Sequence, residues 1–202
     1  MEKKKLFTTR NLVTCGMLSA MAGVLMLLEF PLPFIAPPFY ELDLSEIPAL
    51  VGAFSMGPVA GIIIEFIKVL IKLIIKGTST AFVGDVANFV IGCIFVVTAS
   101  LIYKFKKDRA GALIGMGSAT GIMSITSTFV NAFIMIPLYS VMFHLPLEQI
   151  ISMGNSVNPN VNSLFTFCLI CVLPFNLLKG VIVSAVTFFI YKPLQRLIRG
   201  KV

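Results

Sequence analysis

The chain has 202 residues, of which 57% are hydrophobic and 12% charged, and its formal net charge is +7. Soluble chains carry about 25% charged residues, and a soluble domain of this length could not hide so much apolar surface. Lipid is an acceptable solvent for apolar outer faces. The composition therefore predicts an all-α polytopic membrane protein, with residues 1–202 forming a single transmembrane domain.

The positive charge is clustered. Twelve of the sixteen Lys and Arg residues lie within residues 3–10, 104–109 and 192–201, separated by apolar chain. Nucleic-acid binding would require these basic groups on one face of the protein, among polar or aromatic side chains that contact the bases. The spacing is instead typical of loops that flank membrane helices. We expect a lipid bilayer as surroundings and no nucleic acid as partner.

A helix needs about 20 mostly apolar residues to cross the bilayer. The first is expected at about 11–29, as a retained helix, because no small-x-small cleavage site follows it. A proline cluster over 31–38 then predicts an extended loop. A short helix at about 45–55 follows, with Ser45 as its N-cap.

Gly57-Pro58 begins the next helix, at about 58–76, and further helices are expected at about 85–103, 111–143 and 161–191. The polar stretch 144–160 is interpreted as a loop. The last two helices exceed what a bilayer requires, so tilting is expected. The prediction is a six-helix transmembrane bundle with a short second helix and an extended first outer loop.

With six helices, the N-terminus, the loop after the fourth helix and the C-terminus lie on one side. These are the three basic clusters, so the positive-inside rule places both termini in the cytoplasm.

Polar residues inside apolar helices are the candidate site residues, because an ionisable group in hydrocarbon costs several kcal/mol unless paired or hydrated. Asn176 and Lys179 share a helix face, and Pro174 frees a carbonyl nearby. We favour a ligand site here over a hydrogen-bonded helix contact. For Asn88 and Asn131, ligand contact and structural contact remain equally supported.

Other polar groups receive structural interpretations. Glu65 and Lys68 lie one turn apart, and Lys72 and Lys76 continue that face, which indicates a salt-bridged stripe rather than a proton relay. His144 is expected to be solvated at a helix end.

No P-loop, metal-ligand spacing or catalytic Ser/His/Asp set is visible, so the sequence predicts neither an enzyme nor a cofactor or metal site. Cys15, Cys93, Cys168 and Cys171 all lie in apolar segments and are expected to be small buried hydrophobes. What remains is a binding or transport subunit, powered by another protein.

Several fragments together resemble the substrate-binding S components of energy-coupling factor (ECF) transporters, specifically the riboflavin-selective members. The fragments are Gly16–Ala20, Leu42–Pro48, Phe54–Gly61, Ala87–Phe89, Asn131 with Pro137–Tyr139, and Pro174–Gly180. Their order and spacing cover nearly the whole chain.

The resemblance implies a prokaryotic six-helix subunit of the cell membrane that takes up riboflavin as its transported ligand. It implies partnership with a transmembrane coupling (T) component and two cytoplasmic ATPase subunits. Gly16 and Ala20 match the family's small-x-x-x-small docking motif, although Gly replaces the more usual Ala.

The resemblance also implies ligand-binding roles. Asn131, Asn176 and Lys179 match the family's polar positions well, whereas Asn88 and the loop residues Leu42 and Asp43 match less closely. An apolar pocket with a few amides and an ammonium suits a flat flavin ring with a polar edge. Lys179 or the outer lysines would also tolerate a phosphate, which makes flavin mononucleotide a second expected ligand.

The first loop carries Phe34, Phe39 and Tyr40 and is expected to act as a lid. Three alternatives remain at this point: an S component for another vitamin, a stand-alone secondary transporter with Glu65 as proton carrier, and a membrane enzyme.

Overall fold

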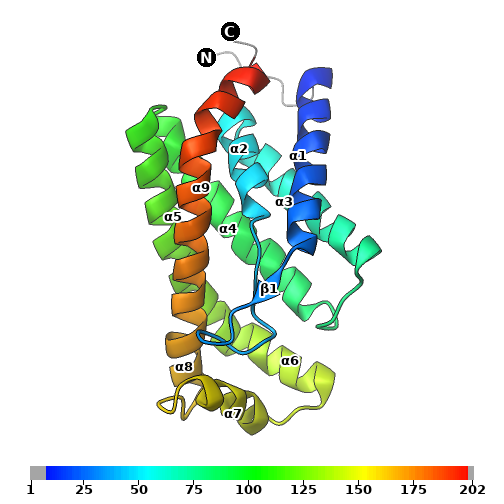
Figure 1. Ribbon diagram of the computed structural model, residues 1–202, viewed down its shortest axis with the longest axis vertical. Coiled ribbons are helices and arrows are strands. Elements are labelled where there is room, and N and C mark those ends of the chain that lie inside the picture. The colour runs from blue at the N-terminus through cyan, green and yellow to red at the C-terminus, as the bar shows by residue number, and fades with distance from the viewer. Residues whose placement is uncertain (1–7, 200–202) are drawn as a thin grey trace.

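The computed structural model describes residues 8–199 and the side chains of residues 8–194. Of the predicted basic clusters, Lys3, Lys4, Lys5 and Lys201 lie outside the described residues, as do the side chains of Arg196 and Arg199. The described chain is an elongated helical bundle (Figure 1).

The first half of the bundle is built from three helices and a short ribbon. Helix α1 (Thr9–Leu27) begins where the Thr8 side chain accepts a hydrogen bond from the Asn11 amide at 3.3 Å. The proline-rich segment that follows is folded back by two-residue strands, β1 (Phe30–Pro31) and β2 (Glu41–Leu42), which pair antiparallel.

Helices α2 (Glu46–Met56) and α3 (Pro58–Ile75) are joined through Gly57, whose φ of +109° is one that L side chains rarely adopt. Every residue of α2 from Glu46 to Ser55 is buried. A helix that is apolar all round belongs inside a protein, and α2 packs against α1, α3, α4 and α9 as the centre of the bundle.

The second half begins with α4 (Val83–Phe105) and α5 (Arg109–Val130), which pack side by side. Asp108 caps α5 by accepting a hydrogen bond from the Gly111 amide at 2.6 Å, and this bond lowers the pKa of the Asp108 carboxyl.

Helix α5 continues through a π-helical turn, η1 (Asn131–Met135), into α6 (Ile136–Phe143). After α7 (Leu147–Val157), the chain runs through α8 (Leu164–Phe167) and a second π turn, η2 (Cys168–Val172), into α9 (Leu173–Arg199).

Within the described residues, four helical segments are long and apolar enough to cross a membrane: Thr9–Leu27, Val83–Phe105, Arg109–Phe143 and Leu164–Leu194. Helix α3 is 18 residues long but carries Glu65, Lys68 and Lys72, all of them buried. Their charges are therefore turned away from the lipid-facing surface. Six spans remain a prediction, since α2 and α3 do not meet the same criterion.

The prediction of a loop over 144–160 is wrong, because α7 occupies Leu147–Val157. Ile150 and Gly154 are its buried positions, four residues apart on one face, while Glu148 lies in its first turn. The asparagines and glycine of this stretch suggested a loop, and the short amphipathic pattern was missed.

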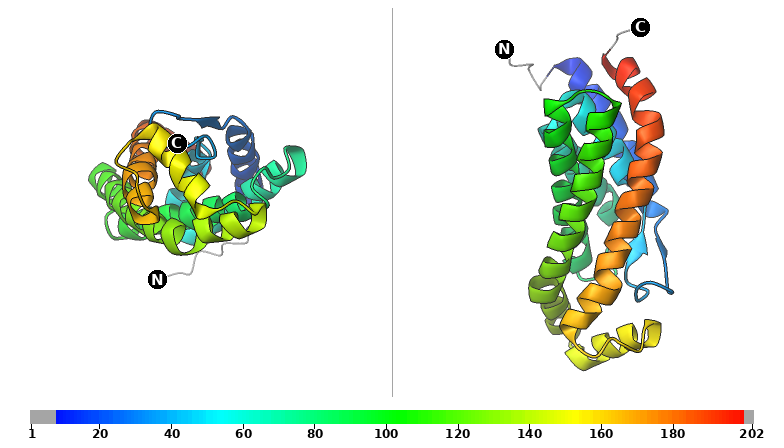
Figure 2. Two further views of the ribbon diagram at one scale, coloured as in Figure 1. Left: turned by 90° about the horizontal axis from the view of Figure 1, so that it is seen from below. Right: turned by 90° about the vertical axis from the view of Figure 1, so that its left-hand side faces the viewer.

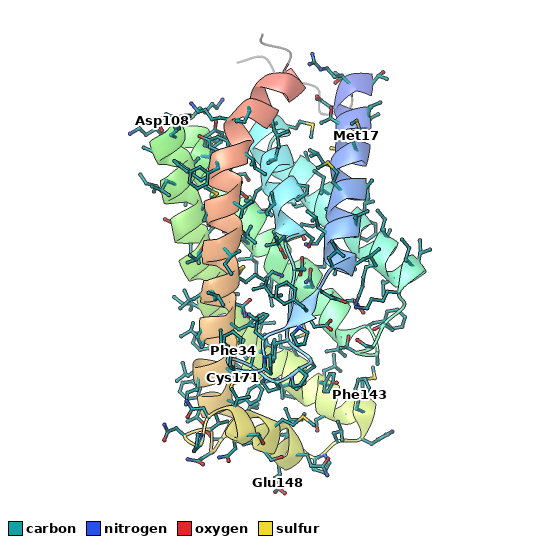
Figure 3. The ribbon with its side chains drawn as sticks, viewed as in Figure 1. Met17, Phe34, Asp108, Phe143, Glu148 and Cys171 are labelled. Carbon is teal, nitrogen blue, oxygen red and sulfur yellow. The ribbon has the colours of Figure 1, made fainter. Side chains whose placement is uncertain are left out.

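The start of α1, the α4–α5 connection and the end of α9 lie at one end of the bundle, whereas α7 and α8 cover the other (Figures 1 and 2). Figure 3 shows Asp108 and Met17 towards the first end, and Phe143, Cys171 and Glu148 towards the second. We call the second end the α7 end.

Candidate functional site: a polar cavity beneath the first connection

A cavity opens between the α1–α2 connection and the helices α4, α6 and α9 in the α7-end half of the bundle. The space between its walls is about 1060 Å³, including the part that opens to solvent. Its aromatic walls are Phe39, Tyr40, Tyr139 and Phe175. Its polar walls include Glu46, Asp85, Asn88, Asn131, Asn176 and Lys179.

Two π turns shape this cavity, and a proline explains each of them. Pro137 and Pro174 each stand two residues after the last residue of a π turn. A proline cannot donate a backbone hydrogen bond within a helix. Just before the two prolines, the amides of Ile136 and Leu173 donate to carbonyls five residues back, those of Asn131 and Cys168. Single π turns of this kind are frequent at functional sites.

Asn131 begins the first π turn and is held from both sides. Its amide nitrogen donates to the Ser127 carbonyl at 2.9 Å, and its Oδ1 accepts a hydrogen bond from the Tyr40 hydroxyl at 2.8 Å. Burial raises the pKa of the Tyr40 hydroxyl well above its usual range, so it stays protonated and remains a donor. The first connection is thereby tied to the end of α5.

Asn176 is oriented in a similar way. Its Nδ2 donates to the carbonyl of Val172, the last residue of the second π turn, at 2.9 Å. No described residue donates to its Oδ1 within hydrogen-bond distance. The side chain lines the cavity with an acceptor available to a ligand.

Lys179 is buried and fully engaged in ion pairs. Its ammonium lies 2.9 Å from Asp43 Oδ2 and 2.9 Å from Glu46 Oε1. Burial opposes ionisation of Asp43, but the ammonium groups of Lys179 and Lys68 hold the pKa of this carboxyl, in the α1–α2 connection, well below its usual range. Lys179 therefore fastens α9 to the connection and to the first turn of α2.

The ion pairs continue into α3. Lys68 lies 2.7 Å from Glu65, 3.3 Å from Glu46 and 2.8 Å from the Ser45 hydroxyl. The expected salt-bridged stripe on α3 is present, with Lys72 bound to Asp85 at 2.5 Å and Lys76 to Glu29 at 2.7 Å. It lies inside the bundle, however, and only its Lys76 end is exposed among these described pairs.

Ser45 does not cap α2 as expected. It stands in a helical conformation at φ −66° and makes no side-chain cap bond. Its hydroxyl instead donates to Asp43 and accepts from Lys68. The buried ammonium offers this hydroxyl a stronger partner than a backbone amide would.

The structure brings four of the predicted ligand residues to the cavity wall: Asn88, Asn131, Asn176 and Lys179. The other two, Leu42 and Asp43, lie behind the wall. Leu42 is buried in the apolar cluster at the α7 end, and Asp43 supports Lys179.

Glu46, Asp85 and Tyr40 are wall residues that the sequence analysis did not assign to the site. Of these three, only Tyr40 was given a role from the sequence, as part of the expected lid. The sequence did contain one signal for the two carboxylates. Helices α3 and α9 carry lysines within apolar segments, and buried ammonium groups require carboxylate partners.

Helix α1 carries a second pair of small residues four apart, Ser19 and Gly23, which faces the opposite way to Gly16 and Ala20. Ser19 and Gly23 are buried, and a Cβ on Gly23 would overlap Ile71 of α3. Gly16 and Ala20 are exposed, and a Cβ on Gly16 would meet nothing within 4 Å. The outer pair leaves a shallow strip on which another helix can approach closely.

Among the described residues, no group of three or more His, Cys, Asp or Glu side chains could hold a metal ion. Cys15, Cys168 and Cys171 are buried free thiols, and Cys93 is half-buried. His144 is exposed, at φ +50° after the end of α6.

Comparison with known proteins agrees with this architecture. Residues 10–191 match the family model of the ECF transporter, substrate-specific component. The chain is 34% identical over 190 residues to the riboflavin transporter RibU of Staphylococcus aureus, covering 94% of this chain and 93% of that protein. It is 32% identical to the riboflavin transporter FmnP of Bacillus subtilis, covering 92% of each.

A solved structure, described as the S component of a bacterial ECF transporter, superposes with a TM-score of 0.71 at 34% identity. The match covers 93% of this chain and 96% of that one.

Proposed function

The chain belongs to the substrate-specific (S) components of ECF transporters, and from this premise we propose that it binds riboflavin for uptake by an energy-coupling module. Its similar relatives are named transporters and not enzymes.

The observation that carries this proposal is the chemistry of the cavity. Its lining combines aromatic side chains with amide and charged groups. An isoalloxazine ring is flat and apolar with a hydrogen-bonding edge, and the ribityl chain is a row of hydroxyls. Pockets for such ligands combine apolar walls with a few fixed polar groups.

We assign direct contact to Asn88, Asn131, Asn176 and Lys179. Asn131 and Asn176 are held by backbone carbonyls at π turns, so each amide is pre-oriented. We assign indirect roles to Asp43 and Leu42. Asp43 holds Lys179 in an ion pair, and Leu42 packs in the buried apolar cluster at the α7 end.

The same proposal includes orientation and partners. Both termini lie in the cytoplasm, since the basic loop at 104–109, the start of α1 and the end of α9 share one end of the bundle. The α7 end then faces outside. A transmembrane T component docks on the exposed Gly16 and Ala20 strip, and two cytoplasmic ATPase subunits drive it.

The direct test is a titration of the detergent-purified chain with riboflavin, followed by flavin fluorescence. We expect quenching that saturates at one equivalent. Asn176→Ala should weaken binding by about tenfold, the loss expected from a hydrogen bond or two, whereas Asn162→Ala, an exposed asparagine beyond the cavity, should not. A chain that leaves micromolar riboflavin unquenched would refute the proposal.

Energy coupling needs a separate experiment. Vesicles that hold this chain with a T component and ATPases should accumulate riboflavin, and an inactive ATPase variant should abolish accumulation. Uptake by the chain alone under a pH gradient would favour the secondary-transporter alternative instead.

A further inference from the structure

Two lysines from different helices share the same pair of carboxylates beside the cavity. Glu46 Oε1 lies 2.9 Å from the Lys179 ammonium on α9 and 3.3 Å from the Lys68 ammonium on α3. Asp43 is shared through both of its oxygens, because Oδ2 accepts a hydrogen bond from Lys179 at 2.9 Å and Oδ1 accepts one from the Ser45 hydroxyl. That hydroxyl in turn accepts a hydrogen bond from Lys68 at 2.8 Å. Both carboxylates are therefore linked to both ammonium groups.

Only one of these two lysines reaches the cavity. Lys179 lines the cavity wall, whereas Lys68, Ser45 and Asp43 do not. Lys68 and Ser45 are 0% exposed, and Asp43 is 1% exposed. Lys68 therefore cannot contact a ligand in the cavity, and any effect that it has on ligand binding has to pass through the groups that it shares with Lys179.

Lys68 is itself held in place by Glu65. The Lys68 ammonium lies 2.7 Å from the carboxylate of Glu65, which stands three residues earlier on the same helix. Glu65 is in turn enclosed by Gly92 of α4, where a Cβ would lie 2.5 Å from Glu65 Oε2. A lysine side chain carries about 2 kcal/mol of rotamer entropy when it is free, and this buried ion pair removes that freedom. Lys68 is therefore a fixed charge beside the two carboxylates.

A fixed second ammonium determines where the Lys179 ammonium lies. Charges interact strongly in a buried site of low dielectric. Without Lys68, the carboxylates of Asp43 and Glu46 would both act on the Lys179 ammonium alone and would draw it between them, away from the ligand. Because Lys68 offsets part of their charge and holds them in place, Lys179 keeps one geometry on the wall. Ligand-binding groups need such support, since a productive geometry is held to within about 0.5 Å.

We propose that Lys68 is a positioning residue of the flavin site, which sets the place of the Lys179 ammonium on the cavity wall through Ser45, Asp43 and Glu46. The inference rests on the proposed riboflavin binding and on the contact assigned to Lys179. It extends the site to a residue of α3 that lies behind the wall, and it gives the buried ion pairs of that helix a role beyond joining helices.

The mildest test removes the hydroxyl that links Lys68 to Asp43. Ser45→Ala should weaken riboflavin binding to the purified full chain by about threefold or more, which is within the range of coupling between residues of one hydrogen-bond network. Fluorescence titration measures the dissociation constant. The matched control is Ser100→Ala, because Ser100 is also buried but its hydroxyl donates to the Val97 carbonyl of its own helix at 3.0 Å. This control should leave the affinity unchanged.

A double-variant cycle separates positioning from a general effect on the fold. In a Lys179→Gln background, Ser45→Ala should cause no further loss of affinity, because its effect passes through the ammonium that is missing. An equal loss of affinity in the native and the Lys179→Gln backgrounds, or no loss in either of them, would overturn the inference. Native affinity in Lys179→Gln itself would overturn it as well.

Lys68 is tested together with Glu65, because Lys68→Met alone would leave buried carboxylates without compensation. The pair Lys68→Met with Glu65→Gln removes one charge of each sign. It should bind riboflavin at least about threefold more weakly than Glu65→Gln alone, and equal affinity of these two variants would overturn the inference. If the pair does not fold, the Ser45 cycle decides. In all these cases the proposed function stands, and it fails only if the native chain binds no riboflavin.

Discussion

The ammonium of Lys179 donates to the carboxylate of Asp43 at 2.9 Å, although the two residues are 136 positions apart in the chain. This pair joins the last long helix to the connection that covers the cavity. It also explains why a lysine can lie in an apolar helix, because its charge is met by two buried carboxylates.

Replacing Lys179 by Met should destabilise the fold by about 3–5 kcal/mol, because it leaves Asp43 and part of Glu46 as uncompensated buried charges. The measurement is thermal unfolding in detergent. Lys107→Met, at an exposed lysine between α4 and α5, is the control. Adding Asp43→Asn to Lys179→Met should restore part of the loss, and a double variant that is no better than the single one would contradict this explanation.

Tyr40→Phe should speed the release of bound flavin by roughly two- to tenfold. The variant removes the hydrogen bond to Asn131, a contribution of about 0.5–1.5 kcal/mol to holding the connection closed. Stopped-flow fluorescence after dilution measures the rate. Phe34→Leu, at a side chain 73% exposed on the same connection, should leave it unchanged. Equal rates for Tyr40→Phe and the native chain would remove the lid hypothesis.

Shortening the connection within Ala36–Tyr40 should speed release further. The deletion removes Tyr40 and the stacking of Phe39 on Tyr139, whose ring centroids lie 5.6 Å apart. Release no faster than in Tyr40→Phe would mean that the hydroxyl alone holds the connection.

Gly92→Ala should destabilise the bundle by about 1–3 kcal/mol, the usual cost of overpacking a filled interior. A Cβ at this position would lie 2.5 Å from Glu65 Oε2, whose carboxylate is held by Lys68. The matched control is Gly121→Ala on α5, where a Cβ meets nothing within 4 Å. That control should be neutral or stabilising, by up to about 1 kcal/mol of helix propensity.

Gly16→Leu should abolish energy-driven uptake while leaving riboflavin affinity unchanged. Gly16 is exposed on α1 and does not line the cavity, so a bulky side chain would block helix docking without touching the site. The control is Gly117→Leu, an exposed glycine on α5. Normal uptake by Gly16→Leu in reconstituted vesicles would place the docking surface elsewhere.

Much of the helical architecture follows from local sequence. Apolar runs, prolines and basic clusters set where a helix begins and ends through residues close by in the chain. The expected ranges 58–76 and 85–103 therefore correspond to α3 and α4 within about two residues at each end. In the part of the chain that the structure describes, α7 was assigned to the wrong class, because its short amphipathic pattern is outweighed by loop-forming residues.

The candidate site could be predicted only in part, because the sequence shows which residues are unusual locally but not which residues meet in space. Asn131, Asn176 and Lys179 stand out locally as polar groups in apolar helices, and the structure places all three on the cavity wall. Asp85 and Glu46 do not stand out, because each lies at a helix start where a carboxylate is ordinary.

By itself, then, the sequence determined a helical membrane protein, the clustering of its positive charges along the chain and the polar positions inside its apolar helices. Hydropathy and backbone geometry are properties of neighbouring residues, and these decide such features. Only the tertiary structure decided which carboxylate meets which lysine and which side chains line the cavity. Those pairings depend on helices distant in the chain being packed together, where the low dielectric makes each missing partner costly.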